Sequence, residues 1–351
     1  MNYKETLFFI GKCLTINYEE HNRILVEKEL KSGTVDWDNV VRVSTGQFVF
    51  PALYCNLKKA NFLDYVPADL VEYMQHITDL NRERNDQIIA QAKEINALLL
   101  ANNITPIFLK GTGNLLEGLY DDIAERMVGD IDFLVKESDC HKAFDILTQV
   151  GYNKLTDIYT DHRHLPRLIH ENRIGAVEIH RKILKDKASN SFNYKHVIDS
   201  IVCLNDISII SYENQIKLSV FAKLINDDSY QIKSISMRSA YDVFSLFYKK
   251  KADIKLDIND NLFKELNAGL LLYSKVLNKP KKMLFIDDDK SINYVNQVIF
   301  SLNKSKKNQS KYYLLMDRFK IILRAFYKKD YLIFILKKIT DINWYKRRFK
   351  I

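Results

Sequence analysis

The sequence predicts a mixed α/β protein in which a small sheet lies between two helical regions. Glycine and proline are scarce, with 10 and 5 among 351 residues, which disfavours all-β folds rich in tight turns. Helical spacing of apolar residues dominates residues 1–100 and returns after about residue 200. Between them, short apolar runs broken by glycines alternate with helical patterns, as expected of a compact α/β unit.

Composition and charge exclude several protein classes. The chain is 47% hydrophobic and 28% charged, which is typical of globular proteins and excludes a wholly disordered chain. Its four cysteines form no CxxC pair, so we expect a reducing cytosol rather than a disulfide framework. Lys12 interrupts the N-terminal apolar patch, and no secretory signal is expected. The predicted location is cytoplasmic, with attachment to a membrane surface left open.

Four regions follow from the pattern: a helical region at 1–100, an α/β core at 101–200, a second helical region at 201–303 and a basic tail at 304–351. In the first region the clearest helix follows Pro67 and ends at Asn102-Asn103. In the core, Pro106 indicates either the start of a strand or a strand at the sheet edge. The expected strands are 104–109, 130–135, 164–169 and 176–183, and the expected later helices are 114–120, 138–150, 212–224 and 237–248.

The basic tail carries the positive charge of the chain. The net charge is +9 overall, and residues 304–351 contribute 15 basic and 3 acidic side chains, or +12, so the remainder sums to −3. Aromatic residues alternate with Lys and Arg throughout this segment. Such a tail can lie on an anionic membrane surface, bind nucleic acid, or pack against the protein body. The sequence leaves these three alternatives open.

Two carboxylates on one strand are the first sign of chemistry. In the segment 129–135, Asp130 and Asp132 point to one face of the strand, and Ile131 and Phe133 point to the other. Close carboxylates repel one another, and a divalent cation is the usual compensation. On the later strand, Glu178 and His180 also share one face. We expect His180 to orient a carboxylate or contact phosphate there.

A glycine turn after the first strand is a candidate phosphate site. Glycines that open a helix leave backbone N–H groups free to face an anion, and Lys and Thr add donors. The spacing differs from that of a Walker loop. The residues of this turn are Lys110, Gly111, Thr112, Gly113 and Asn114.

The combination of turn and carboxylates indicates nucleotidyl transfer. Three carboxylates can hold two Mg²⁺ ions about 3.5–4 Å apart, as in two-metal phosphoryl-transfer sites. A zinc cluster built from His162, His164, His170 and His180 is disfavoured, because no cysteine lies near them and their spacing matches no standard zinc pattern.

The ordered motifs resemble a known family. The stretches FLKGTGNLLEGLY, ERMVGDIDFLV, LTQVGY, HRHLPRLIH and AVEIHRKIL resemble the bacterial uncharacterised nucleotidyltransferases, a branch of the DNA polymerase β-like nucleotidyltransferase superfamily. The resemblance covers roughly residues 85–250 and includes MRSAYDVFSLF. It implies a nucleotidyltransferase fold for the small mixed sheet. It also implies that Asp130, Asp132 and Glu178 bind metal.

The resemblance extends to phosphate binding and to the reaction. It implies that Gly111 and Thr112 hold phosphates, and that Lys110 and Arg126 are basic residues of the family's motifs. The predicted function is Mg²⁺-dependent transfer of a nucleoside monophosphate from an NTP to a hydroxyl acceptor, with release of pyrophosphate. The alternatives are a different phosphoryl transfer on the same scaffold, or a non-catalytic module that binds nucleotide or an anionic surface.

Overall fold

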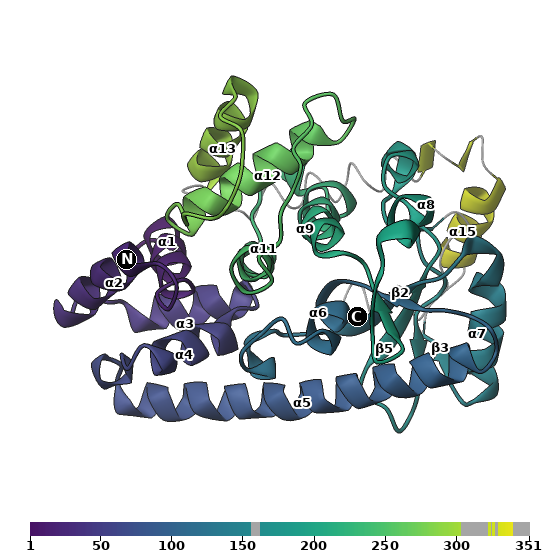
Figure 1. Ribbon diagram of the computed structural model, residues 1–351, viewed down its shortest axis with the longest axis horizontal. Coiled ribbons are helices and arrows are strands. Elements are labelled where there is room, and N and C mark those ends of the chain that lie inside the picture. The colour runs from purple at the N-terminus through teal and green to yellow at the C-terminus, as the bar shows by residue number, and fades with distance from the viewer. Residues whose placement is uncertain (156–161, 303–321, 324, 327–328, 340–351) are drawn as a thin grey trace.

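One seven-stranded sheet and the helices around it make up the described part of the chain (Figure 1). The computed structural model describes residues 1–155, 162–302, 322–323, 325–326 and 329–339. It confirms the predicted α/β class and the flanking helical regions. None of the helices within these residues has the length and apolar character needed to cross a membrane.

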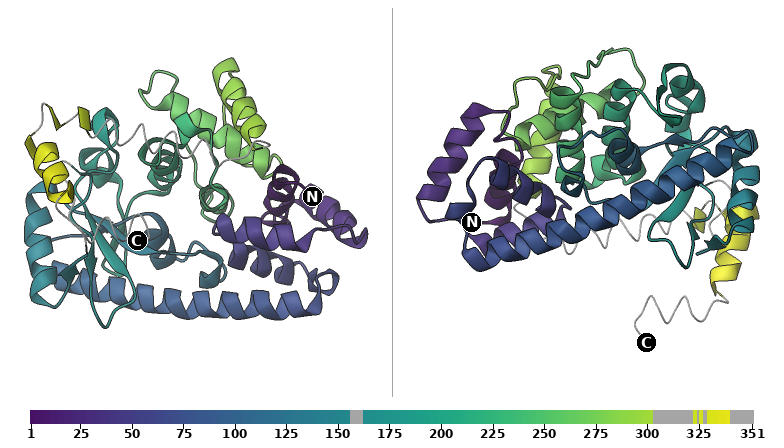
Figure 2. Two further views of the ribbon diagram at one scale, coloured as in Figure 1. Left: turned by 180° about the vertical axis from the view of Figure 1, so that it is seen from behind. Right: turned by 60° about the horizontal axis from the view of Figure 1, so that its bottom comes forward.

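A 33-residue helix, α5 (Ala68–Leu100), connects the N-terminal helices to the sheet. It begins directly after Pro67, as the sequence predicts, because proline is favoured at the start of a helix. Figures 1 and 2 show it running along one side of the molecule, from α4 to the end of α7. The helices that precede it are α1 (Tyr3–Cys13), α2 (Glu20–Lys31), α3 (Trp37–Gly46) and α4 (Phe50–Lys59).

The sheet has the strand order β3-β4-β5-β2-β1-β7-β6. Its two longest strands, β2 and β5, are parallel neighbours near the centre. Strand β1 pairs antiparallel with β2 and parallel with β7. The strand bounds are β1 (Ile107–Phe108), β2 (Asp130–Leu134), β3 (Asn153–Lys154), β4 (Leu168–Ile169), β5 (Ala176–His180), β6 (Val202–Leu204) and β7 (Ile207–Ile209).

Short helices connect the strands, and longer ones follow the sheet. The connecting helices are α6 (Lys110–Leu116), α7 (Cys140–Gln149) and α8 (Tyr194–Val197). After the sheet come α9 (Tyr212–Phe221), α10 (Ser229–Ile232), α11 (Met237–Lys249), α12 (Phe263–Val276), α13 (Asp289–Ser301) and α15 (Lys329–Ile339).

Several predicted boundaries differ from the structure. Strand β1 begins after Pro106 and lies inside the sheet, so the proline marks a strand start and not a sheet edge. Helix α6 begins at Lys110 instead of Asn114. Ser138 does not cap α7, because a 3₁₀ turn at Glu137–Asp139 precedes that helix. The sheet also continues to Ile209, beyond the expected core boundary at residue 200.

The two faces of the central strands have opposite character. Ile131 and Phe133 of β2 and Val177 and Ile179 of β5 are fully buried. They face α5, since the side chains of Ile88 and Ile131 both lie within 3 Å of the position that a Cβ on Gly175 would take. The opposite face carries the polar side chains of the same strands. Burial of the apolar face therefore leaves the carboxylates on the side of α9 and α11.

A close helix contact joins the N-terminal helices to the second helical region. A Cβ added to Gly11 of α1 would lie 2.0 Å from the backbone oxygen of Val276 at the end of α12. Because backbone atoms cannot move aside as a flexible side chain does, only glycine fits here.

We predict that Gly11→Ala lowers the free energy of unfolding by about 1–3 kcal/mol, the usual cost of overpacking a close contact. Gly46→Ala is the matched control, since nothing lies within 4 Å of its Cβ position at the end of α3. That change should be neutral or slightly stabilising, because alanine favours helix over glycine. Urea denaturation measures both. Equal stability of the two variants contradicts the close contact.

Candidate active site

Register between β2 and β5 brings three carboxylates together. The parallel pairing sets Asp132 directly opposite Glu178, with Asp130 one strand repeat away on the same face. We call Asp130, Asp132 and Glu178 the carboxylate cluster. The side chains of Asp132 and Glu178 are only 10% and 5% exposed, whereas that of Asp130 is 30% exposed. Negative charge is thus concentrated at a largely buried point.

Two basic side chains of the protein compensate this charge. Lys110 donates from Nζ to Oδ1 of Asp132 at 2.6 Å. Arg167 donates from Nη2 to Oδ2 of Asp130 at 3.1 Å and to Oε1 of Glu178 at 2.5 Å. Arg167 therefore connects the two strands across the cluster. Charge-assisted hydrogen bonds of this kind are the strong ones in proteins.

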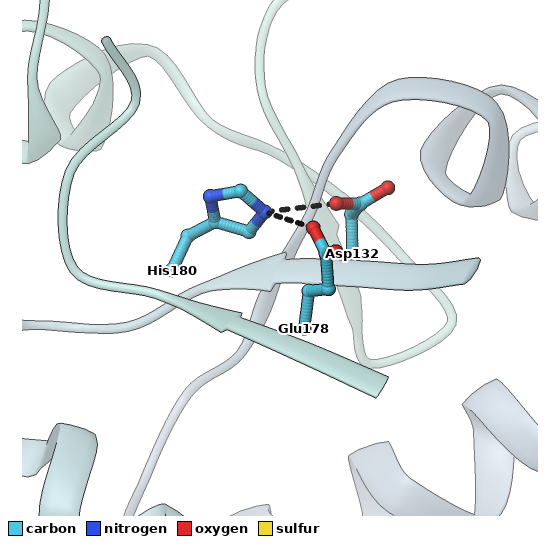
Figure 3. A group of neighbouring side chains, drawn as sticks. All are labelled: Asp132, Glu178 and His180. Carbon is cyan, nitrogen blue, oxygen red and sulfur yellow. Dashed lines mark hydrogen bonds and ion pairs between the residues drawn. The ribbon is translucent and has the colours of Figure 1, made fainter. Parts of the chain in front are cut away.

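A histidine lies against the cluster from β5. Nε2 of His180 is 2.8 Å from Oδ1 of Asp132 and 3.5 Å from Oε2 of Glu178 (Figure 3). The side chain is 1% exposed, and its Nδ1 has no hydrogen-bond partner among the residues that the structure describes. His164 is a further neighbour, with Nε2 3.7 Å from Oε1 of Glu178. The two carboxylates, Lys110 at 3.5 Å from Nε2 and the ring of His164 thus surround the His180 ring.

The three carboxyl groups have different electrostatic environments. Burial raises the pKa of Asp130, and Arg167 offsets this only in part. Burial also acts on Asp132, but Lys110 and His180 outweigh it and hold the pKa of Asp132 below its usual value. For Glu178 the neighbouring histidines, led by His180, outweigh burial and hold its pKa far below the usual range. Asp132 and Glu178 are therefore ionised at neutral pH and suited to bind a cation.

The glycine turn lies directly beside this cluster. Lys110 has φ +53°, a left-handed conformation that is costly for a residue with a side chain. Thr112 donates its hydroxyl to the backbone oxygen of Asp130 at 3.0 Å, which ties the turn to β2. Gly113 approaches the backbone of β1, where an added Cβ would lie 2.9 Å from the oxygen of Phe108. The turn thus fixes the position of the Lys110 Cα atom, from which the side chain reaches Asp132.

An ion pair joins the wall built by the sheet and the glycine turn to the wall built by α9 and α11. Arg126 donates from Nε to both carboxylate oxygens of Asp242 on α11, at 2.9 and 3.1 Å. Tyr120 donates its hydroxyl to Oδ1 of Asp242 at 2.6 Å and accepts from Asn114. Arg238 lies close by, and burial together with the Arg126 charge lowers the pKa of Arg238 to about 10. Arg126 thus pairs with Asp242, while Arg238 donates to the backbone oxygen of Met127 at 3.3 Å.

Sheet and helices enclose a cleft of about 270 Å³ between these two walls. Gly111, Lys110 and Asn114 line it together with the carboxylate cluster, while Thr112 and Gly113 lie behind its surface. Its basic lining residues are Lys110, Arg126, Arg163, Arg167, Lys223 and Arg238, and its acidic ones are Asp130, Asp132, Glu178, Asp227 and Asp242. A cleft with this lining suits a ligand that carries several negative charges and a cation.

Several charged lining residues are given no role by the sequence analysis, among them Arg167, Arg238 and Asp242. Arg167 stands in the HRHLPRLIH motif but was not assigned a role, because its partners come from β2 and β5. Asp242 and Arg238 lie in MRSAYDVFSLF. A signal for Asp242 did exist: a lone acid among the apolar residues of α11 requires a buried partner. Nothing in the sequence identifies that partner as Arg126.

The donor atoms fit a divalent metal ion. Asp132, Glu178 and His180 each offer one ligand atom, and these atoms lie within 4.8 Å of one another. Asp130 does not belong to this trio. Arg167 connects it to Glu178 by donating hydrogen bonds to both carboxylates. Carboxylate oxygens and a neutral imidazole are common ligands of divalent ions.

A comparison with protein families identifies the chain. The model described as "Uncharacterised nucleotidyltransferase" matches residues 33–277, well over half of the sequence. The chain belongs to the uncharacterised nucleotidyltransferase family. Its matched region runs from the N-terminal helices to the end of α12 and includes the whole cleft. No curated protein and no solved structure matches the chain.

Most of the predicted basic tail, residues 304–351, lies outside the described residues. Within it, α15 buries Tyr331 and exposes Leu332 and Ile333 by 45% and 41%. The membrane, nucleic-acid and packing alternatives for the tail remain predictions.

We predict that Asp242→Asn lowers the free energy of unfolding by about 3–5 kcal/mol, because it leaves Arg126 buried without its counter-charge. Asp227→Asn is the control in the same cleft, since Asp227 is 51% exposed and pairs with Lys223. That variant should lose less than about 1 kcal/mol. Denaturation in urea compares them, and a small loss in both would contradict a structural role for the Arg126–Asp242 pair.

A second prediction concerns Glu117. Its Oε2 accepts a hydrogen bond from Gln215, and its Oε1 has no partner within the described part of the chain. Burial raises the pKa of Glu117 from 4.5 to about 7. Between these values the folded state holds a proton that the unfolded chain releases, so stability falls as the pH rises through this window. Glu117→Gln removes the effect. Relative to wild type, the variant should gain up to about 3 kcal/mol between about pH 4 and pH 8. A difference that does not change with pH in denaturation experiments would contradict the prediction.

Proposed function

We propose that this nucleotidyltransferase moves a nucleoside monophosphate from an NTP to a hydroxyl acceptor and releases pyrophosphate. The observation that carries the proposal is the carboxylate cluster in a cleft that Lys110, Arg126 and Arg238 also line. Family membership supports transfer of a nucleotidyl group in general. The cytoplasm is the proposed location.

The reaction forms one bond and breaks one. An acceptor hydroxyl oxygen attacks the α-phosphorus, and the bond from that phosphorus to the bridging oxygen of the β-phosphate breaks. Pyrophosphate leaves with the electron pair. Asp130 is the carboxylate best placed to take the acceptor's proton, because it is the most exposed of the three.

A divalent cation completes the charge balance of this reaction. We propose two Mg²⁺ ions, held by Asp130, Asp132 and Glu178, as the source of hydroxyl activation and of charge stabilisation at the leaving group. The triphosphate itself needs positive charge from the protein. Lys110, Arg126 and Arg238 line the cleft and are proposed to supply it. Gly111, Thr112, Gly113 and Asn114 are proposed to shape the turn beside the phosphates.

The test follows radiolabel from α-labelled NTPs to acceptors in a cell extract, with Mg²⁺ present. We predict that wild type transfers label and that Asp132→Asn lowers turnover by on the order of a hundredfold or more while it keeps the fold, because the lost charge stabilises the transition state. Asp79→Asn is the matched control. Asp79 is 48% exposed on α5 and pairs with Arg82, so its loss should leave turnover unchanged.

Two outcomes would overturn the proposal in different ways. Transfer from γ-labelled but not α-labelled NTP would indicate a different phosphoryl transfer on the same scaffold. Tight NTP binding by the wild type with no transfer from any NTP would indicate a binding module without catalysis. Circular dichroism of each variant establishes that the fold is kept.

A further inference from the structure

His180 lies against two of the three carboxylates of the cluster. It lies two residues after Glu178 on the same face of β5, and its Nε2 points at one oxygen of each neighbouring carboxylate (Figure 3). The side chain is essentially inaccessible to solvent, with 1% exposed. Carboxylates alone would provide only oxygen ligands. This imidazole adds a nitrogen to the same small space.

A cation of the protein already lies in that space. Nζ of Lys110 is 2.6 Å from Oδ1 of Asp132 and 3.5 Å from Nε2 of His180. Lys110 lines the cleft whereas His180 does not, so the ammonium group covers the imidazole from the cleft side. A proton on Nε2 would form hydrogen bonds to the carboxylates, but the ammonium group of Lys110 would repel it. A lone pair on Nε2 suits a cation placed among all three residues.

From this arrangement we infer that Asp132, Glu178 and His180 form a metal centre with one nitrogen ligand, which binds Mn²⁺ more tightly than Mg²⁺. The inference deepens the proposed function and rests on it for the role of the metal in transfer. The three ligand atoms lie within 4.8 Å of one another, close enough for one ion to reach all of them after small side-chain movements.

The preference for Mn²⁺ follows from ligand chemistry. Mg²⁺ is a hard ion that favours oxygen ligands and keeps several waters in a strict octahedron. First-row transition ions accept imidazole nitrogen readily, and they tolerate carboxylate oxygen as well. A centre with two carboxylates and one histidine therefore favours the transition ion. Mg²⁺ can still occupy it through the carboxylates at higher concentration.

Lys110 has a second role in this arrangement. An entering ion must displace its ammonium group from Asp132, because both require the same carboxylate oxygen. The released side chain remains in the cleft, where it can contact a phosphate of the bound nucleotide. The metal centre and the phosphate site are thereby coupled through one residue.

Pulsed EPR of Mn²⁺ bound to the full chain tests the nitrogen ligand directly. We predict electron spin-echo modulation from a histidine nitrogen in the wild type, with a pattern that changes when the protein is made with heavy-nitrogen histidine. His180→Gln offers an amide oxygen in place of the ring nitrogen. It should abolish the modulation and reduce the preference for Mn²⁺ over Mg²⁺, measured by calorimetry, by about tenfold.

His164→Gln is the matched control. Its Nε2 is 3.7 Å from Glu178 and its Nδ1 lies 2.7 Å from the backbone oxygen of Leu165, so it stands outside the trio. This variant should keep the modulation. If the wild type binds Mn²⁺ but shows no nitrogen modulation, the inference is wrong. The isotope experiment uses only the wild type, so it does not depend on whether a variant folds. If nitrogen ligation is seen but no label is transferred from any NTP, the proposed function is wrong and the metal centre is still supported.

Discussion

The pairing of β2 with β5 is the constraint on which the rest of the site depends. Asp132 and Glu178 face each other because the two strands are parallel and in this register. A slip of one residue would turn Glu178 to the opposite face. Register is held by the apolar side chains that alternate with the carboxylates, since Ile131, Phe133 and Val177 are completely buried. Core packing on one face therefore determines charge placement on the other.

Charge compensation follows from that placement. Three carboxylates so close together would oppose folding unless cations lay among them. Lys110 and Arg167 provide this compensation, and Lys110 does so from a strained backbone conformation. Such strain persists only where the surrounding structure enforces it, and it concentrates at functional sites. The same two side chains line the cleft, where a polyphosphate would need positive charge.

The cleft joins parts of the chain that are far apart in sequence. One wall comes from the sheet and the first turn of α6, and the other comes from α9 and α11 of the second helical region. The Arg126–Asp242 pair ties the two walls together within the protein interior. The family match spans both walls, and the sheet and the later helices line one cleft, although their sequence patterns look like separate regions.

The sequence predicts a secondary-structure element correctly where its pattern of apolar residues is long. Helix α5 and strands β2 and β5 were recognised because each has enough residues to show a period. The hairpin of β6 and β7 was missed, because its strands have three residues each. A signal was present in Asn205-Asp206, whose positive φ values form the two-residue turn that asparagine and aspartate favour.

For the site, the sequence by itself determined which side chains share a face of one strand. Alternation is a local property of extended backbone, so Asp130 with Asp132, and Glu178 with His180, followed from spacing alone. Only the tertiary structure decided which charges meet across the chain. Arg167 joins two strands, and Arg126 joins α11, through contacts between residues remote in sequence. Coulomb attraction depends on distance in space, and chain packing alone sets that distance.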